Sequence, residues 1–179
     1  MGKAQSAFAM LFPGPGRRDP LHHAAEVWAA VASGLGGRLF DALREQRSLA
    51  YTVLAFAWPR MQAGALGTYI AMAPEREAEA RDAMLAELAR FVAAPVTPDE
   101  LQGAIGYLAG QAAVQRQSAG HLLSEIVDAW LMGRGLEELE DPAAPYRRVT
   151  AEEVWRVARE SLRPERRAEG VVRGTGGGR

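Results

Sequence analysis

The chain has 179 residues, a formal net charge of −1 at pH 7 and no cysteine. This length matches one ordinary domain, which buries roughly 70% of its unfolded surface and therefore needs no covalent or metal staple to fold. The absence of cysteine excludes disulfides, thiolate metal sites and a cysteine nucleophile, and the balanced charge gives no general attraction to nucleic acid or to an anionic membrane.

The first half of the chain predicts strands and helical segments. The first apolar run ends at Pro13 and is typical of a buried strand. Asp19-Pro20 predicts the start of a helix, with Asp19 as the N-cap. Two later runs on either side of Pro59 predict an antiparallel hairpin. The expected elements are a strand over 7–12, helices over 19–32 and 38–45, and strands over 49–58 and 64–73.

The second half of the chain is predicted to be mostly helical. Thr97 and Thr150 each open a capping box, which marks the start of a helix. Ser118 is expected to cap a third helix. The expected elements are helices over 74–94, 97–117, 118–132 and 150–162, a proline-broken loop over 141–145, and a last strand over 168–174.

This order of elements predicts an α+β fold. Few strands are followed by a block of helices, which favours a single two-layer domain with a mostly antiparallel sheet and helices packed on one face. We find no internal repeat and no break that would divide the chain. We therefore expect one domain over residues 4–174 and a flexible tail over 175–179. No apolar run approaches the roughly 20 residues of a membrane helix, and we expect no signal peptide at the start of the chain.

The histidines do not predict a metal site. His22 and His23 are adjacent, so on a helix their side chains are expected to point about 100° apart and not to share an ion readily. His121 and Glu125 could share one helix face, but two ligands do not make a zinc site. No His-x-x-Glu-His pattern is present. We assign no metal to this chain.

Other chemistry is equally hard to place from spacing alone. No Gly-x-Ser-x-Gly elbow is present, and the glycines at 34–37 lack the Gly-Lys-Ser/Thr of a phosphate loop. The loop at 13–16 is either a simple turn or an anion site with Arg17 and Arg18. At a predicted helix–strand junction, Arg44 and Tyr51 could offer fixed donors to a carbonyl oxygen or an oxyanion. A surface arginine and a half-buried strand tyrosine would explain the same pattern.

One segment carries a family resemblance. Gly36-Gly37-Arg38-Leu39-Phe40, followed by Leu43-Arg44-Glu45 and Leu49-Ala50-Tyr51, closely resembles the C-terminal, non-zinc half-domain of the pitrilysin, insulysin and mitochondrial processing peptidase family of inverted-motif zinc metallopeptidases. The resemblance continues in the same order along nearly the whole chain, at Phe12–Pro15, Val96–Leu101, Val149–Val154 and Val171-Val172.

The resemblance implies a specific division of labour. Such enzymes pair two related α+β halves across a chamber, and the first half binds zinc through His-x-x-Glu-His and a distal glutamate. The second half supplies an arginine and a tyrosine, spaced as Arg44 and Tyr51 are, that reach the substrate backbone. The resemblance therefore implies a substrate-positioning half of a zinc endopeptidase, with zinc, peptide substrate and catalytic water on a partner half. Gly37 and Ser48 depart from the family, which often has serine and glycine at these two positions.

Two alternatives remain open at this stage. The chain could be a non-catalytic scaffold or partner subunit, in which Arg44 and Tyr51 are idle, or a peptide-binding module that uses a sheet edge. A homodimer is also an expectation if the chain is separated from its other half. Trp28, Trp130 and Trp155 are candidates for such an interface, although the core is the expected place for each. The sequence leaves the substrate and the compartment open, with a cytoplasmic or periplasmic bacterial protein as the expectation.

Overall fold

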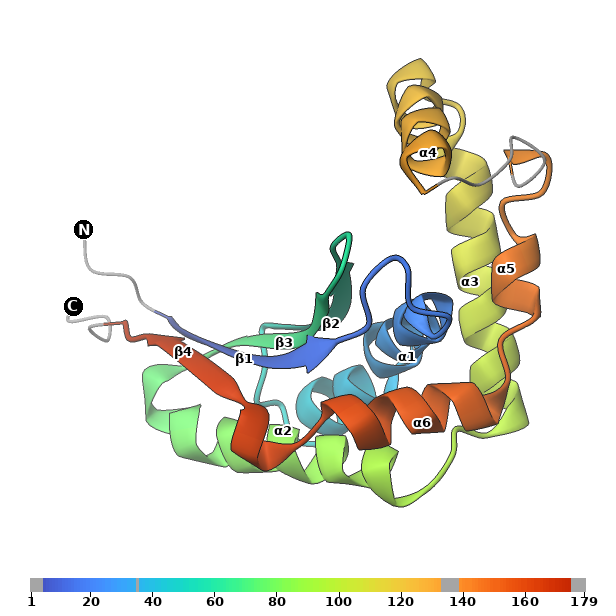
Figure 1. The fold of residues 1–179 in the computed structure, drawn as a ribbon. Coiled ribbons are helices and arrows are strands. Elements are labelled where there is room, and N and C mark those ends of the chain that lie inside the picture. Colours follow the sequence, from blue (N-terminus) through green and yellow to red (C-terminus); the bar gives the residue numbers. More distant parts are fainter. Residues whose placement is uncertain (1–4, 35, 133–138, 175–179) are drawn as a thin grey trace.

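The computed structural model describes residues 5–34, 36–132 and 139–174. Figure 1 shows its helices and strands. The strands are β1 Ser6–Gly14, β2 Thr52–Pro59, β3 Gly64–Met72 and β4 Ala168–Val172. The α-helices are α1 His22–Ser33, α2 Glu77–Ala93, α3 Pro98–Gln115, α4 Ala119–Leu131, α5 Ala144–Arg147 and α6 Ala151–Ser161. Shorter helical segments are η1 Phe40–Glu45, η2 Pro74–Arg76 and η4 Pro164–Arg166.

The strands form a four-stranded antiparallel sheet in the order β2-β3-β1-β4. The hairpin predicted around Pro59 is the β2–β3 pair, and β4 returns from the end of the chain to pair with β1 (Figure 1). The predicted α+β class with a mostly antiparallel sheet is confirmed. The predicted tail over 175–179 lies outside the described residues.

Alternation along the strands places one face of the sheet against the helices. Phe8, Met10 and Phe12 of β1 are buried on this face, while their neighbours along the strand are more accessible. Helices α1, α2 and α6 pack against this face (Figure 1). Trp28 of α1 is fully buried beneath the sheet and meets the Phe91 ring edge-on, with a centroid distance of 5.8 Å. This layer is the hydrophobic core of the molecule.

The opposite face of the sheet is apolar but partly open to solvent. Leu54 and Trp58 of β2 are exposed there, and the Phe56 ring lies over Gly67 of β3, where a Cβ atom would come within 2.2 Å of the ring. The register places Leu11 on the same face. A monomer rarely leaves contiguous apolar surface exposed without a use for it.

An ion pair ties the segment after α1 to the start of α3. The Arg38 guanidinium donates to both oxygens of Glu100, at 2.6 and 2.8 Å. Glu100 also completes the capping box predicted at Thr97, because its carboxylate accepts from the Thr97 amide. The Arg38 guanidinium is the main reason that the pKa of Glu100 falls to about 2. One carboxylate therefore holds both a helix start and the segment that leads into η1.

Acid should weaken this connection. The pKa of Glu100 is lowered by folding from about 4.5, so its contribution is fully present above that value and disappears as the pH falls toward 2. Glu100→Gln is expected to lower the free energy of unfolding by about 1–3 kcal/mol at pH 7, since Arg38 loses its charged partner. Urea unfolding at pH 7, 5 and 3 measures the difference from the native chain, which should shrink below pH 4.5.

The exposed pair Arg76–Glu79 provides the control for this acid prediction. Glu79→Gln is expected to change the unfolding midpoint little, because exposed ion pairs contribute little to stability. If the free energies of unfolding of the native chain and of Glu100→Gln differ by the same amount at pH 7 and at pH 3, the role given to Glu100 is wrong.

Several local expectations were wrong. Helix α1 begins at His22 and not at Pro20, because the Asp19 carboxylate accepts from the Leu21 amide at 2.8 Å and forms a separate turn. The short helix α5 begins inside the predicted loop at 141–145 and ends two residues after it. Trp130 was expected in the core but is exposed. Strand β2 begins at Thr52, three residues later than predicted, because the Leu49 amide is still bonded to the Leu43 carbonyl of η1.

Candidate functional site

The arginine of the Arg44–Tyr51 segment lies at the end of a π-helical turn. In η1 the Gln46 amide donates to the Asp41 carbonyl at 2.9 Å, a bond that spans five residues. Leu43 is fully buried and anchors the turn in the core. Arg44 is exposed, with its guanidinium 4.9 Å from the centroid of the Phe40 ring. The backbone at Arg44 is therefore fixed, while its charged end faces solvent.

The turn that follows is closed by two nested hydrogen bonds. The Leu49 amide donates to the Leu43 carbonyl at 2.8 Å, and the Ser48 amide donates to the Arg44 carbonyl at 3.0 Å. The backbone of Ser48 has a φ of 50°, which lies in the left-handed region. The arrangement is a Schellman-type helix end widened by one residue. It ends η1 sharply and directs the chain into β2.

Tyr51 lies just before β2, where its backbone is held and its side chain is free to meet a ligand. The Tyr51 amide donates to the Ala71 carbonyl of β3 at 2.8 Å, whereas 60% of the residue surface is exposed. Segment η1 packs against β2 and α2. Arg44 and Tyr51 are thus two exposed side chains on one short, well-anchored connection.

The two departures from the family pattern have different structural consequences. A Cβ atom at Gly37 would come within 2.8 Å of the Gly34 amide nitrogen, so this backbone has no room for the serine that the resembled family pattern often has here. Ser48 keeps the left-handed conformation that glycine adopts more easily. The turn therefore retains its shape, but the backbone of Ser48 is strained.

Replacing Ser48 by glycine should stabilise the protein. A non-glycine residue in the left-handed region costs about 1–2 kcal/mol, part of which is offset because glycine gains entropy in the unfolded chain. We expect Ser48→Gly to raise the free energy of unfolding by about 0.5–1 kcal/mol, measured by urea denaturation. Gln46→Gly is the matched control, because Gln46 has an ordinary φ of −80°. Gln46→Gly should destabilise the chain, and equal losses in both variants would contradict the strain assigned to Ser48.

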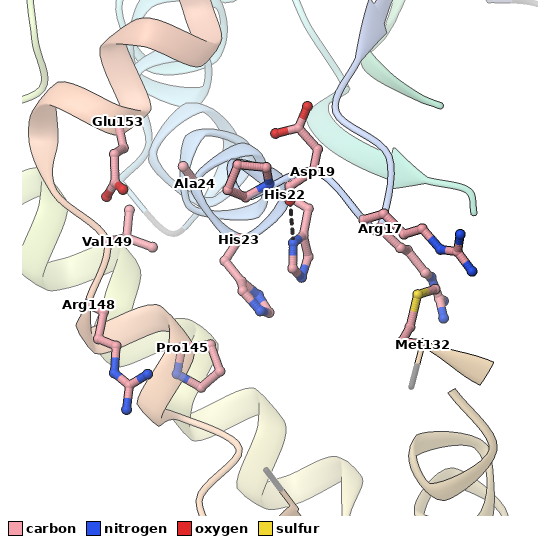
Figure 2. A pocket seen from close by; sticks show the side chains of 12 residues that line it. Arg17, Asp19, His22, His23, Ala24, Met132, Pro145, Arg148, Val149 and Glu153 are labelled. Carbon is pink, nitrogen blue, oxygen red and sulfur yellow. Dashed lines mark hydrogen bonds between the residues drawn. The ribbon is translucent and has the colours of Figure 1, made fainter. Parts of the chain in front are cut away.

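A cavity lies away from this segment, at the N-terminal end of α1 (Figure 2). It has a volume of about 480 Å³ and is lined in part by Arg17, Asp19, His22, His23 and Arg148. Segment η1 follows the other end of α1. The cavity and the Arg44–Tyr51 segment are therefore separate features of the surface.

The two adjacent histidines lie closer together than predicted. The ring centroids of His22 and His23 are 3.7 Å apart, because the His22 ring turns back and its Nδ1 lies 2.8 Å from the Asp19 carbonyl oxygen (Figure 2). The expectation of divergent rings was wrong, since His22 is the first residue of α1 and is not held to the helical side-chain direction. His23 instead lies 3.5 Å from Glu26, whose carboxylate also accepts from the Tyr146 hydroxyl at 2.7 Å.

This histidine cluster serves packing between helices. Burial raises the pKa of Glu26, but the nearby His23 ring and the hydrogen bond from the Tyr146 hydroxyl outweigh this effect and leave that pKa below its usual value. In residues 5–34, 36–132 and 139–174, no group of three or more histidine, cysteine or acidic side chains could hold a metal ion. As predicted, His121 and Glu125 share one face of α4, at 3.5 Å. Across the same ranges, none of the helices is both long and apolar enough to cross a membrane.

The end of α1 forms a hydrogen bond to the edge strand β2. The Ser33 hydroxyl, at the end of α1, donates to the Ala55 carbonyl of β2 at 3.0 Å. A hydroxyl thus occupies an acceptor that an added strand would use. This contact weighs against a module that binds peptides by adding a strand at β2. Neither this contact nor the open apolar face of the sheet could be found without the register of the strands.

Comparison with known proteins gives a consistent result. Residues 1–108 match the family model described as the peptidase M16 inactive domain. An uncharacterized zinc protease of Streptomyces coelicolor is 29% identical over 162 residues, which are 89% of this chain and 35% of that protein. An uncharacterized zinc protease of Mycobacterium tuberculosis is 31% identical over 133 residues, 74% of this chain and 30% of that protein. The chain thus spans about a third of the length of these relatives.

The solved structures agree on the fold. A peptidase M16 inactive domain from Pseudomonas fluorescens superposes with a TM-score of 0.82 at 21% identity, over 96% of this chain and 41% of that one. A protease from Helicobacter pylori superposes with a TM-score of 0.80 at 14% identity, over 94% of this chain and 41% of that one.

Proposed function

Because the chain belongs to the family of peptidase M16 inactive domains, we propose that it is the substrate-positioning half of a zinc endopeptidase. In this proposal residues 4–174 form one half-domain, and a partner half, in the same parent chain or in a separate subunit, binds the zinc ion. Arg44 and Tyr51 contact the substrate backbone beside that ion. The partner half and a peptide are thus the two binding partners.

The geometry of the Arg44–Tyr51 segment is the observation that carries the proposal. A π-helical turn, two nested hydrogen bonds and the pairing of Tyr51 with Ala71 fix its backbone, yet both side chains are exposed. The Arg44 guanidinium contacts the Phe40 ring, but the side chain remains exposed and can still reach a ligand. A rigid backbone with exposed donors is suited to hold a ligand that is supplied from outside.

The open face of the sheet supports a partner of substantial size. Leu54 and Trp58 are exposed on β2, the strand that directly follows Tyr51. A second half facing this surface would cover it, and interfaces between such halves resemble ordinary protein interfaces in size. The relatives named zinc proteases are about three times as long as the matched region, which leaves room for a zinc-bearing half.

The chemistry assigned to this half is electrostatic. The zinc ion of the partner half would supply an activated water and polarise the scissile carbonyl. The Arg44 guanidinium offers several N–H donors in a fixed plane, and the Tyr51 hydroxyl offers one more. Donors aimed at the carbonyl oxygen stabilise the negative charge that develops when water adds to the carbon. They also hold the peptide in register, which raises the effective concentration of the reacting bond.

Reconstitution tests the proposal. The 179-residue chain is mixed with a zinc-bearing half of a close relative that carries His-x-x-Glu-His, and hydrolysis of a quenched fluorescent peptide is measured. We expect activity only when both halves are present, and its loss with a chelator. The zinc half alone and the chain alone are the controls. A complex that forms, as shown by sedimentation, but does not hydrolyse peptides would favour the scaffold alternative.

A further inference from the structure

Helix α4 has its charged side turned inward and its apolar side turned to solvent. Asp128 forms an ion pair with Arg17, and Glu125 accepts from Arg116 at 2.8 Å. Of its residues only Ala129 is buried. The outward side consists of apolar side chains, here called the α4 outer face: Leu122, Leu123, Ile126, Val127, Trp130 and Leu131.

This arrangement reverses that of an ordinary surface helix, which turns its charges to water. At the centre of the α4 outer face Leu123 is 61% exposed and Trp130 is 77% exposed. Because Trp130 is so exposed, the prediction that it lies in the core was wrong. In Figure 1, α4 stands at the far end of α3, away from the sheet and its helical layer. The hydrophobic effect therefore favours covering this face with another apolar surface.

The apolar residues of the α4 outer face are spaced symmetrically along the helix. They come as three adjacent pairs, 122–123, 126–127 and 130–131, and the centre of the pattern lies between Ile126 and Val127. When two copies pack antiparallel about a two-fold axis at this centre, Trp130 of one copy meets Leu123 of the other. Each apolar pair of one copy then packs against an apolar pair of the other copy. This is the self-complementarity that a two-fold interface requires.

We propose that the α4 outer face binds a second copy of this chain as an antiparallel helix pair. The exposed apolar surface is on the order of 600 Å² per copy, close to the roughly 800 Å² that each partner contributes to a standard interface. Two symmetry-related tryptophan–leucine pairs, one on each side of the axis, are the kind of aromatic anchor that dominates binding energy. The flanking carboxylates Glu125 and Asp128 do not oppose the contact, because arginines of the same copy neutralise them. The inference does not depend on the proposed function.

Sedimentation of the 179-residue chain tests the contact. At roughly 100 μM, above the micromolar Kd expected of a small apolar interface, the native chain should have about twice its monomer mass of 19.3 kDa. The double variant Leu123→Glu, Trp130→Glu should raise Kd by at least about 100-fold, so that at roughly 10 μM, where the native chain is still mostly dimeric, the variant is mostly monomeric. Trp58→Glu on the open sheet face is the matched control and should dimerise normally. A monomeric native chain, or a dimer that only Trp58→Glu disrupts, would overturn the proposal.

Cross-linking tests the direction of the pair without disturbing its anchors. Because the chain has no cysteine, Ile126→Cys and Ala119→Cys each introduce a single thiol on the same side of α4, seven residues apart. An antiparallel pair brings two copies of residue 126 together but keeps two copies of residue 119 roughly 20 Å apart. A short bismaleimide should therefore link only Ile126→Cys. Linking of both positions would indicate a parallel pair, and linking of neither would refute the contact.

A zinc-bearing half is the competing occupant. If the native chain stays monomeric, and adding that half protects the α4 amides from hydrogen exchange, the surface belongs to the partner and the second-copy proposal is wrong.

Discussion

Arg44→Ala in the reconstituted peptidase is expected to lower kcat/KM by about 10²–10³-fold, the loss seen when one preorganised oxyanion donor is removed. The reason is geometric. The Arg44 backbone is held by its bond to Ser48, and the side chain is exposed, so the substitution removes donors without disturbing the core. The free energy of unfolding of the isolated chain should change little. Steady-state hydrolysis of a fluorogenic peptide measures the effect.

The neighbouring residues provide matched controls for Arg44. Arg47→Ala removes another exposed guanidinium, three residues away, and should leave kcat/KM within about twofold, since surface substitutions away from a site are usually neutral. Arg44→Lys keeps the charge but not the planar fork, and should give an intermediate loss. Tyr51→Phe removes one neutral donor and should cost less than Arg44→Ala. Activity that survives both Arg44→Ala and Tyr51→Phe would show that the site lies elsewhere.

Trp28→Ala is expected to destabilise the domain by about 3–5 kcal/mol, as aromatic-to-alanine changes in cores do. Trp28 is fully buried and packs edge-on against Phe91 of α2, so its removal leaves a cavity where α1 and α2 meet beneath the sheet. With a total stability of about 5–15 kcal/mol for a domain of this kind, the loss is a large share. Urea unfolding followed by circular dichroism measures it.

Two other tryptophan substitutions show whether packing is the cause. Trp58→Ala removes the same side chain from an exposed place and should cost much less. Trp28→Phe keeps most of the packing, and it breaks no hydrogen bond, because in the described part of the chain the Trp28 indole nitrogen has no partner. Similar losses for Trp58→Ala and Trp28→Ala would contradict the cavity explanation.

The sequence by itself determined the elements whose signals are local. The capping boxes at Thr97 and Thr150 start α3 and α6 as predicted, because both hydrogen-bond partners lie within one helical turn. The hairpin around Pro59 was equally clear, since β-branched and aromatic runs on both sides of a breaker leave few other structures. The order of these elements was enough for the α+β class. The Arg44–Tyr51 segment was found through its motif, and spacing alone left it ambiguous.

Only the tertiary structure decided what depends on distant contacts. The π-helical form of η1 and the left-handed Ser48 follow from the need to bury Leu43 and Leu49 on either side of a sharp turn. Trp130 has a core-like residue type, and only the position of α4 beyond the sheet leaves it in solvent. The open face of the sheet appears only when the strand register is known. Helix periodicity gives the faces of a helix, but the side that is buried depends on what the rest of the chain places beside it.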